Sequence, residues 1–139
     1  MEEFILALDQ GTSSSRALLY DNSGKTISIA QQAIEMSHPK DGWVEQDPNE
    51  IWDSVLATGR EAICSSGIDP KFIKGIGITN QRETTLVWNK KTGECVYNAI
   101  VWQDRRTITT CIEMDSATLD GKALSEQIAD KTGLLIDPY

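Results

Sequence analysis

A polar segment between two apolar runs, LDQGTSSSRALLY (residues 8–20), carries residue types that bind phosphate. Asp9 ends the first apolar run, Gly11 permits a tight turn, and hydroxyl residues 12–15 precede Arg16. Backbone N–H groups of such a turn can bind phosphate oxygens, to which hydroxyl and guanidinium groups also donate. A carboxylate beside a phosphate can hold hydrated Mg²⁺. The alternative is an ordinary polar hairpin turn, because Gly, Ser, Thr and Asp all favour turns.

A second polar segment, residues 80–83 (NQRE), interrupts the apolar sequence at the end of an expected strand. Ligands of open α/β sheets bind at this end of the strands. Arg82 donates and Glu83 accepts hydrogen bonds, a combination that suits a neutral polyol. Neighbouring side chains of an extended segment point to opposite sides, so both reach one ligand only if the segment is a loop. The alternative is a solvated turn with an incidental ion pair.

The elements that must position these segments form an α/β pattern. Phe4 to Leu8 predicts a strand buried on both faces, and residues 16–20 and 26–36 predict two more strands. Short turns between them require antiparallel neighbours, and the apolar alternation slips at residues 30–33, which predicts a bulge or bend. Residues 71–79 predict a strand parallel to the first one, after a helical crossover.

That crossover helix has a clear start signal at residues 47–50. Asp47 is the expected N-cap, Pro48 the first helical residue, and Glu50 the partner in a capping box. The helix should span about 18 residues, the length of the periodic segment. Its expected apolar face consists of Ile51, Val55, Ala62 and Ile63.

The last third of the chain predicts a hairpin followed by two helices. Residues 84–88 and 95–102 are expected strands around the turn at residues 89–94. Residues 105–114 and 122–131 are expected helices, and the second ends at Gly133.

Composition excludes several function classes. The 139 residues carry a formal net charge of −8, so no basic field attracts nucleic acid or an anionic membrane. The apolar run near the N-terminus is too short for a signal peptide or a membrane span, which favours the cytoplasm. Cys64, Cys95 and Cys111 are scattered and predict reduced thiols, mostly in the core. Neither a Walker A pattern nor a protein-kinase Gly-rich loop is present in the sequence.

Five motifs in collinear order resemble one family. DQGTSSSR, GWVEQDP, GITNQRET, NAIVWQDRRT and TGLLIDPY are similar to the N-terminal part of the FGGY carbohydrate kinases, and in particular to glycerol kinases. The resemblance runs from about residue 4 to residue 139, and GITNQRET is its most specific part. It implies the actin-like, ribonuclease-H-like ATPase fold, in which two lobes enclose a cleft. Residues 1–139 then correspond to the N-terminal portion of the first lobe, apparently truncated after Tyr139.

The resemblance implies phosphorylation of glycerol by Mg²⁺-ATP, giving sn-glycerol 3-phosphate and ADP. Thr12, Ser13 and Ser14 correspond to ATP-phosphate contacts, Arg16 to a nucleotide contact and Asp9 to the carboxylate near the metal. Arg82, Glu83 and Tyr139 correspond to glycerol contacts, with Trp102 as an apolar wall. The family's catalytic aspartate lies beyond residue 139, so the chain alone is expected to be inactive. The parent protein is expected to be a cytoplasmic homo-oligomer.

Two other functions stay open. One is a kinase for another polyol or sugar, against which the NQRET segment weighs. The other is a non-catalytic actin-like module that binds a polyol or a protein partner. Elsewhere, Trp43 is expected to be a packing anchor, His38 to be solvated, and Asp104 to pair with Arg105 or Arg106.

Overall fold

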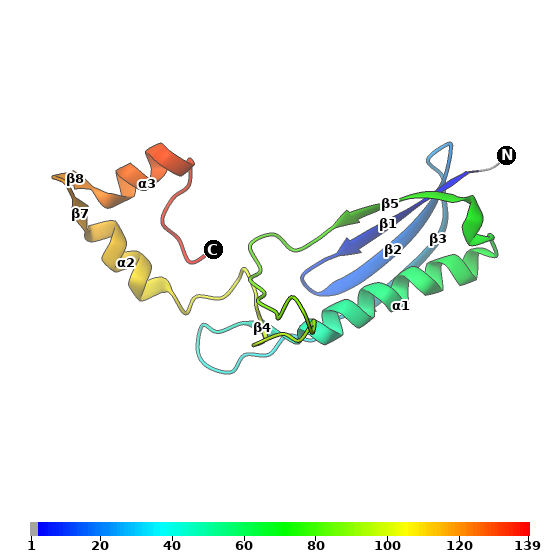
Figure 1. The fold of residues 1–139 in the computed structure, drawn as a ribbon, viewed down its shortest axis with the longest axis horizontal. Helices are drawn as coiled ribbons and strands as arrows, with labels where there is room; N and C mark the ends of the chain where they lie inside the picture. The colour runs from blue at the N-terminus through cyan, green and yellow to red at the C-terminus, as the bar shows by residue number, and fades with distance from the viewer. Residues whose placement is uncertain (1–2) are drawn as a thin grey trace.

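The computed structural model describes residues 3–139, with a four-stranded mixed sheet at one end of an elongated molecule (Figure 1). The strands are β1 Phe4–Gln10, β2 Ser14–Asp21, β3 Thr26–Ala33 and β5 Ile73–Thr79, in the order β3-β2-β1-β5. Neighbours β1–β2 and β2–β3 pair antiparallel, whereas β5 pairs parallel to β1. The predicted topology of three antiparallel strands followed by a parallel one is therefore confirmed.

The crossover between β3 and β5 is helix α1, Pro48–Ser66, which lies along one face of the sheet (Figure 1). Asp47 is the N-cap and accepts a hydrogen bond from the Asn49 N–H, as predicted. The predicted capping box is wrong, because the Glu50 carboxylate accepts instead from the Glu35 N–H at 3.0 Å. Glu50 thus ties the start of the helix to the segment after β3.

The buried face of α1 is made of small residues. Ser54, Thr58, Gly59 and Ala62 are its buried members. The predicted apolar face is correct at Ala62, which is buried, and at Ile63, which is half-buried and packs against the core. Ile51 and Val55 are half-buried. Small side chains let the helix lie close to the sheet, and a Cβ on Gly59 would come within 3.3 Å of Leu8 Cδ2.

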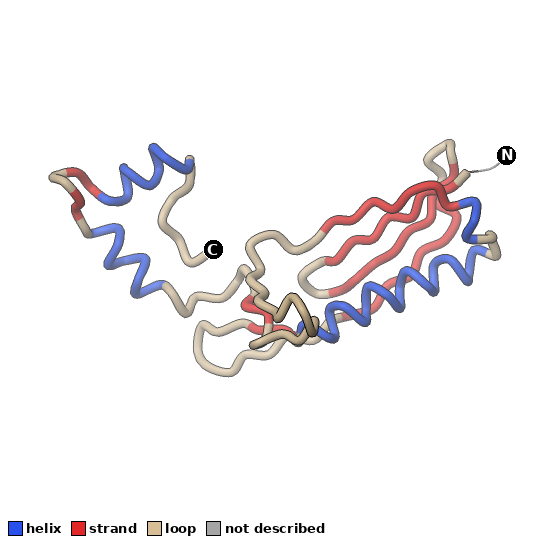
Figure 2. The backbone as a smooth tube through the Cα atoms, viewed as in Figure 1, coloured by secondary structure: helices blue, strands red, loops and turns tan. Residues whose placement is uncertain are grey.

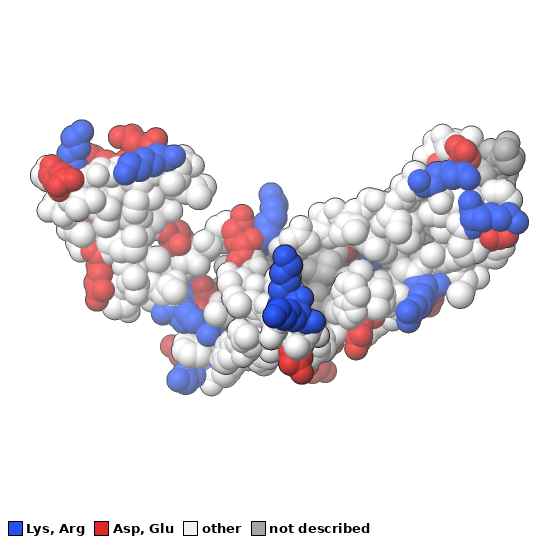
Figure 3. Space-filling model, in the orientation of Figure 1, with Lys and Arg blue, Asp and Glu red and all other residues white. Residues whose placement is uncertain are grey.

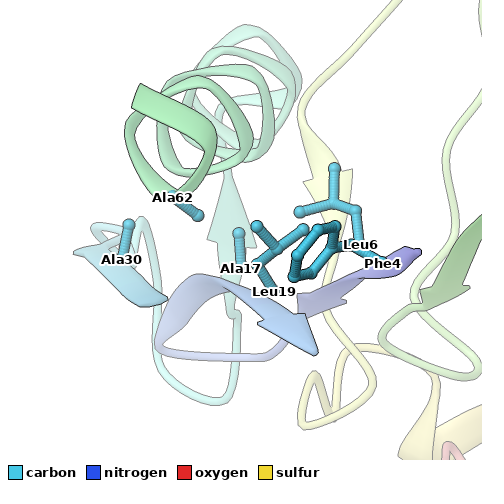
Figure 4. Packing of buried hydrophobic residues seen from close by; sticks show 6 residues of the cluster. All are labelled: Phe4, Leu6, Ala17, Leu19, Ala30 and Ala62. Atoms are coloured by element: carbon cyan, nitrogen blue, oxygen red, sulfur yellow. The ribbon is translucent and has the colours of Figure 1, made fainter. Parts of the chain in front are cut away.

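The main core lies between α1 and the sheet (Figure 4). Its buried members are Phe4, Leu6, Ala17, Leu19, Ala30 and Ala62. On the other face of the sheet, Ile5 and Ile29 are 46% and 58% exposed. The prediction that the first strand is buried on both faces is therefore wrong for residues 3–139. Continuous apolar sequence did not reveal that α1 covers only one face.

Strand β3 is regular where a bulge was expected. Residues 30–33 keep an unbroken register with β2, from Ala30↔Ala17 to Ala33↔Ser14. The register shift lies nearer the start of the strand, where Leu19 pairs with Ser28 and Tyr20 with Thr26. The slip in apolar alternation arises because Ile29 faces outward and Ala30 inward, and it does not reflect a break in pairing.

Short elements and loops fill the middle of the molecule (Figure 2). There, β4 Glu45–Gln46 pairs with β6 Ala99–Ile100. The 3₁₀ turn η1 Pro70–Phe72 lies instead at the end of the sheet near the N-terminus, between α1 and β5 (Figure 1). The expected hairpin turn is present, since the Asn89 N–H donates to the Glu94 carbonyl at 2.8 Å. Of its expected strands, only Ala99–Ile100 forms one, as β6, and the two arms pair through the isolated bridges Thr85↔Ile100 and Trp88↔Cys95. Most residues of the hairpin are exposed, so burial does not extend the pairing.

The C-terminal part contains two short helices joined by a hairpin. These elements are α2 Ile108–Ser116, β7 Thr118–Leu119, β8 Lys122–Ala123 and α3 Leu124–Thr132. Helices α2 and α3 pack on each other, and α3 ends at Gly133 as predicted. On the face drawn in Figure 3, basic side chains are interspersed with acidic ones.

The cysteines differ in part from expectation. All three are free thiols, but Cys64 is exposed and Cys95 and Cys111 are half-exposed, so none is core filler. Within residues 3–139, every helix is too short or too polar to cross a bilayer.

Candidate functional site

The turn between β1 and β2 is built around Gly11. Its N–H donates to the Ser14 carbonyl at 2.9 Å, and a Cβ on Gly11 would lie 3.0 Å from that oxygen. Because a 3.0 Å contact to a backbone oxygen is tighter than most real Cβ contacts, glycine lets the turn close without a shift of the backbone. The turn places Thr12 beside a cavity formed at the carboxyl ends of β1 and β5.

The other hydroxyls of this segment have different surroundings. Ser15 is buried and shares a 2.8 Å hydrogen bond with the Ser54 hydroxyl of α1. Ser14 lies in β2 and accepts from Gln31 Nε2 at 2.9 Å, while Ser13 is exposed. Among the three expected phosphate-contacting residues, Thr12 lines the cavity and Ser13 and Ser14 do not.

Asp9 and Arg16 are direct neighbours across β1 and β2. They form an ion pair of 2.8 Å between Asp9 Oδ2 and Arg16 Nη2, with both side chains partly exposed. Asp9 lines the cavity, whereas Arg16 lies beside it and reaches it through this ion pair.

The NQRE segment forms the loop that the Arg-Glu pair requires. Glu83 has a φ of 59°, a left-handed conformation that is uncommon for a residue other than glycine. This bend lets Arg82 and Glu83 line the same cavity. Within residues 3–139 no ion pair joins the two side chains to each other, so both keep their charged groups for another partner.

Two aromatic rings complete the wall. Trp102 and Tyr139 pack edge to face, with ring centroids 5.5 Å apart and planes at 80°. Trp102 Nε1 also donates to Thr12 Oγ1 at 2.9 Å, which joins the aromatic wall to the turn. The cavity has a volume of about 290 Å³ and is lined by Asp9, Gln10, Gly11, Thr12, Asn80, Gln81, Arg82, Glu83, Trp102 and Tyr139.

The donor set fits a metal ion carried by phosphate better than one held by protein alone. Residues 3–139 contain no cluster of three or more side chains of the types that ligate metals. Mg²⁺ commonly keeps several waters and uses one or two carboxylates together with substrate phosphates. Asp9 supplies one carboxylate at the cavity, and Arg16 holds only its Oδ2 atom.

A buried ionic cluster beside the site was not predicted as a unit. Arg106 Nη2 lies 2.8 Å from both Glu45 Oε1 and Asp104 Oδ2, and its Cζ is 3.8 Å from the centroid of the Trp43 ring. The expected pairing of Asp104 with an arginine and the packing role of Trp43 agree with this arrangement. Arg105 pairs instead with Asp137, at 3.1 Å.

The cluster shifts the pKa values of its members. Burial alone would raise the pKa of Glu45, but hydrogen bonds from Arg106, Asn98 and Tyr97 outweigh it and lower that pKa. Burial would likewise raise the pKa of Asp104, and hydrogen bonds from Arg106 and the Val44 N–H lower it. The Asp104 carboxylate in turn raises the pKa of Arg106. All three groups are therefore charged at neutral pH.

Two buried glutamines are the other residues that sequence reasoning missed. Gln46 and Gln81 are 1% and 8% exposed and hydrogen-bond to each other at 2.9 Å. Gln81 stands next to Arg82 in the polar segment, but a glutamine in a polar stretch carries no sign of burial. Only the tertiary fold shows that Gln81 lines the cavity and that the amide of Gln46 lies behind it.

Comparisons with known proteins identify the family of the chain. The family model described as the FGGY family of carbohydrate kinases, N-terminal domain, matches residues 4–139. Glycerol kinase of Chromobacterium violaceum is 52% identical over 138 residues, which is 99% of this chain and 27% of that protein. Glycerol kinase of Marinomonas sp. is 53% identical over 139 residues, again 27% of its length. The chain thus spans about a quarter of the length of these relatives.

Solved structures show the same fold. Plasmodium falciparum glycerol kinase with ADP has a TM-score of 0.86 and 32% identity, covering 99% of this chain and 26% of that one. Gluconate kinase from Lactobacillus acidophilus has a TM-score of 0.80 and 26% identity, with the same coverage. The predicted fold class, an α/β mixed sheet of the actin-like ATPase type, is confirmed. The chain belongs to the FGGY family of carbohydrate kinases and matches the N-terminal domain of that family.

Proposed function

We propose that residues 1–139 are the N-terminal portion of a kinase that transfers a phosphoryl group from Mg²⁺-ATP to glycerol, giving sn-glycerol 3-phosphate and ADP. The observation that carries this proposal is that the turn at Thr12 and the pair Arg82 and Glu83 line one cavity. A phosphate-binding turn and a polyol-binding pair must face each other for such a transfer. Relatives of about 50% identity named glycerol kinase support glycerol as the acceptor.

The polyol side of the cavity fits a small, neutral, hydroxyl-rich molecule. Arg82 donates hydrogen bonds to hydroxyl oxygens, and Glu83 accepts from hydroxyl hydrogens. The rings of Trp102 and Tyr139 provide an apolar surface for a carbon chain. A volume of about 290 Å³ leaves room for a three-carbon polyol.

The phosphate side depends on Thr12 and Asp9. The Thr12 hydroxyl accepts a hydrogen bond from Trp102, so its own hydrogen can be donated to a phosphate oxygen. Ser13 and Ser14 are proposed to contact phosphate from outside the cavity, and Arg16 to contact the nucleotide. Bound Mg²⁺ would neutralise phosphate charge, and Asp9 would hold it while Arg16 orients that carboxylate.

We propose that the catalytic base lies outside residues 1–139 and that the chain by itself does not catalyse the transfer. Phosphoryl transfer depends on positioning and charge stabilisation, which a cleft closed on both sides supplies. The proposal includes a cytoplasmic, homo-oligomeric parent protein.

A full-length fusion tests the proposed substrate. In this fusion, residues 1–139 replace the matching segment of the Chromobacterium violaceum glycerol kinase. ADP release is measured with glycerol, gluconate and D-xylulose. A control fusion carries the matching segment of the Lactobacillus acidophilus gluconate kinase in the same position. We expect glycerol-dependent ADP release from the first fusion and much less from the control.

Two outcomes would contradict the proposal. A folded fusion that prefers gluconate or xylulose would assign the chain to another sugar kinase. Calorimetry on the isolated chain tests the non-catalytic alternative, because tight glycerol binding without ATP would favour a binding module. Glycerol-dependent ADP release from the isolated chain, at the rate of the fusion, would place the whole active site within residues 1–139.

A further inference from the structure

Five residues form a closed ring of hydrogen bonds in and behind the cavity wall, with Thr12, Gln81 and Trp102 in the lining and Gln46 and Thr84 outside it. Gln46 Nε2 donates to the Thr12 carbonyl at 2.7 Å, and Gln81 Nε2 donates to Gln46 Oε1 at 2.9 Å. Thr84 Oγ1 donates to Gln81 Oε1 at 3.1 Å, and the Trp102 N–H donates to Thr84 Oγ1 at 3.3 Å. The Trp102 indole closes the ring at Thr12 Oγ1, at 2.9 Å. The ring joins four segments that are far apart in the sequence.

The members of the ring are held in one orientation. Gln46 is 1% exposed and Gln81 is 8% exposed, so water cannot readily replace a lost partner. Each amide donates to one neighbour and accepts from the other, so turning one amide over would break its hydrogen bonds on both sides. An unpaired buried amide is costly, which favours the closed ring over any partly broken form.

Backbone pairing between β4 and β6 also holds Gln46 in place. Gln46 lies in β4 and is paired with Ala99 of β6, three residues before Trp102. Within the ring, Gln46 bridges the Thr12 turn and the loop that carries Arg82. Gln46 itself does not line the cavity.

We propose that Gln46 is a positioning residue that holds the phosphate-facing turn and the polyol-facing loop at a fixed separation. This inference rests on the proposed function, because it assigns one substrate to each of the two walls. Without the bridge, both walls of the cavity can shift. The binding of glycerol and the binding of ATP should therefore weaken together, and the reacting groups should no longer be aligned. Small displacements of reacting groups cost rates on the order of 10²-fold.

The test uses the full-length fusion with Gln46→Met, which keeps the side-chain length and removes both hydrogen bonds. We expect KM for glycerol and KM for ATP to rise together by about threefold or more, and kcat to fall by about tenfold. Leu19→Ala is the matched control, because it creates a core cavity and the core cluster contains none of the five ring residues. It should lower thermal stability while leaving both KM values within about twofold.

Hydrogen–deuterium exchange measured by mass spectrometry gives a readout that does not need activity. In Gln46→Met, exchange should become faster in residues 10–14 and also in residues 80–85, since the bridge between them is lost. Leu19→Ala should not accelerate exchange in these two segments selectively. If the unsubstituted fusion lacks glycerol kinase activity, the proposed function fails, and the exchange data still decide whether Gln46 couples the two segments.

Three results would overturn the proposal. The first is a Gln46→Met fusion with both KM values and kcat within about twofold of the unsubstituted fusion. The second is a kinetic and exchange profile that matches Leu19→Ala, which would show a merely structural role. If Gln46→Met does not fold, Thr84→Val breaks the ring at another point, outside the cavity lining. The third result that would overturn the proposal is a Thr84→Val fusion in which both KM values and the exchange at residues 10–14 are unchanged.

Discussion

At the scale of single residues, the site depends on a backbone conformation that Glu83 adopts at a cost. Among residues 3–139, Glu83 and Asp120 are the only residues other than glycine with positive φ. Such conformations cost about 1–3 kcal/mol and persist where the surrounding structure holds them. Gln81 supplies that support through its hydrogen bonds to Gln46 and Thr84. The result is that Arg82 and Glu83 share one cavity.

The first prediction concerns Arg82. In the full-length fusion, Arg82→Ala should raise KM for glycerol by about tenfold or more and KM for ATP by much less, because charged hydrogen bonds to the polyol are lost. Arg60→Ala, which removes an exposed arginine of α1, is the matched control. Steady-state kinetics with each substrate varied in turn measure both constants. Equal effects on the two substrates would argue for a structural role of Arg82.

The second prediction concerns Asp9. Asp9→Asn in the fusion should increase the Mg²⁺ concentration needed for half-maximal activity by several-fold, because one anionic ligand becomes neutral. Arg16→Gln separates the two roles, since it removes the ion pair and leaves the carboxylate in place. Asp53→Asn, on the exposed side of α1, serves as control. An unchanged Mg²⁺ titration for Asp9→Asn would remove Asp9 from the metal site.

At the scale of elements, the close approach of α1 to the sheet holds β1 and β2, and hence the Thr12 turn, in place. The approach depends on small side chains, with Gly59 against Leu8 and the Ser54 hydroxyl against Ser15. Ser15 follows the turn directly, so its bond to α1 fixes the start of β2. Bulky residues on this face of α1 would force the helix away from the sheet.

The third prediction tests that packing. Gly59→Val should destabilise the chain by about 1–3 kcal/mol, because the added methyl groups meet Leu8 and a β-branched residue fits poorly in a helix. Ala57→Val places the same side chain at an exposed position of the same helix and should cost less than about 1 kcal/mol. Thermal melting followed by circular dichroism compares the two variants. Equal melting temperatures would show that α1 can shift to accept the larger residue.

At the scale of the whole molecule, a buried ionic cluster joins the sheet region to the C-terminal helices. Arg106 lies just before α2 and pairs with Glu45 of β4 and with Asp104. The Glu45 carboxylate also accepts hydrogen bonds from Tyr97 and Asn98, so the cluster also contacts the segment that follows the turn at residues 89–94. Figure 1 shows β4 between the four-stranded sheet and α2, so the ion pairs of the cluster connect these two parts of the elongated molecule.

The fourth prediction follows from the lowered pKa values of Glu45 and Asp104. Since both pKa values are lower in the folded state, the cluster contributes stability above the ordinary carboxyl pKa and loses it as pH falls through the lowered values. The melting temperature of the chain should therefore fall on acidification below about pH 4.

Removing Arg106 should reverse the direction in which stability changes with pH. In Arg106→Met, both carboxyls lose their charged partner and keep only neutral donors, namely Tyr97 and Asn98 for Glu45 and the Val44 N–H for Asp104. Burial should then raise the pKa of both carboxyls above their unfolded values, so stability should decrease as pH rises from about 4 to 7. Breaking a buried ion pair costs about 3–5 kcal/mol at neutral pH. Arg105→Met, which removes only an exposed ion pair, is the control. A pH profile of Arg106→Met parallel to that of the unsubstituted chain would contradict this account.

Local rules were sufficient for the order and type of the main elements. Asp47 and Pro48 mark the start of α1 in any context, because capping uses groups within one turn. Short turns made β1, β2 and β3 antiparallel, and the long crossover made β5 parallel. Six residues that were singled out from their chemistry or from the family motifs line the cavity, and their roles there stay predictions: Asp9, Thr12, Arg82, Glu83, Trp102 and Tyr139.

The tertiary structure decided which surfaces meet. The buried face of α1 proved to be Ser54, Thr58, Gly59 and Ala62, because the closeness of helix and sheet, rather than hydrophobicity, selects small residues there. The bridge through Gln46 could not be foreseen for a related reason. A glutamine can be solvated or buried, and only Thr12 and Gln81, brought from two distant segments, satisfy both ends of the Gln46 amide. By itself, the sequence determined the elements and the chemistry of the motifs, since both depend on nearby residues. The tertiary structure alone decided the separation of the Thr12 turn and the loop that carries Arg82, because long-range hydrogen bonds and packing set that distance.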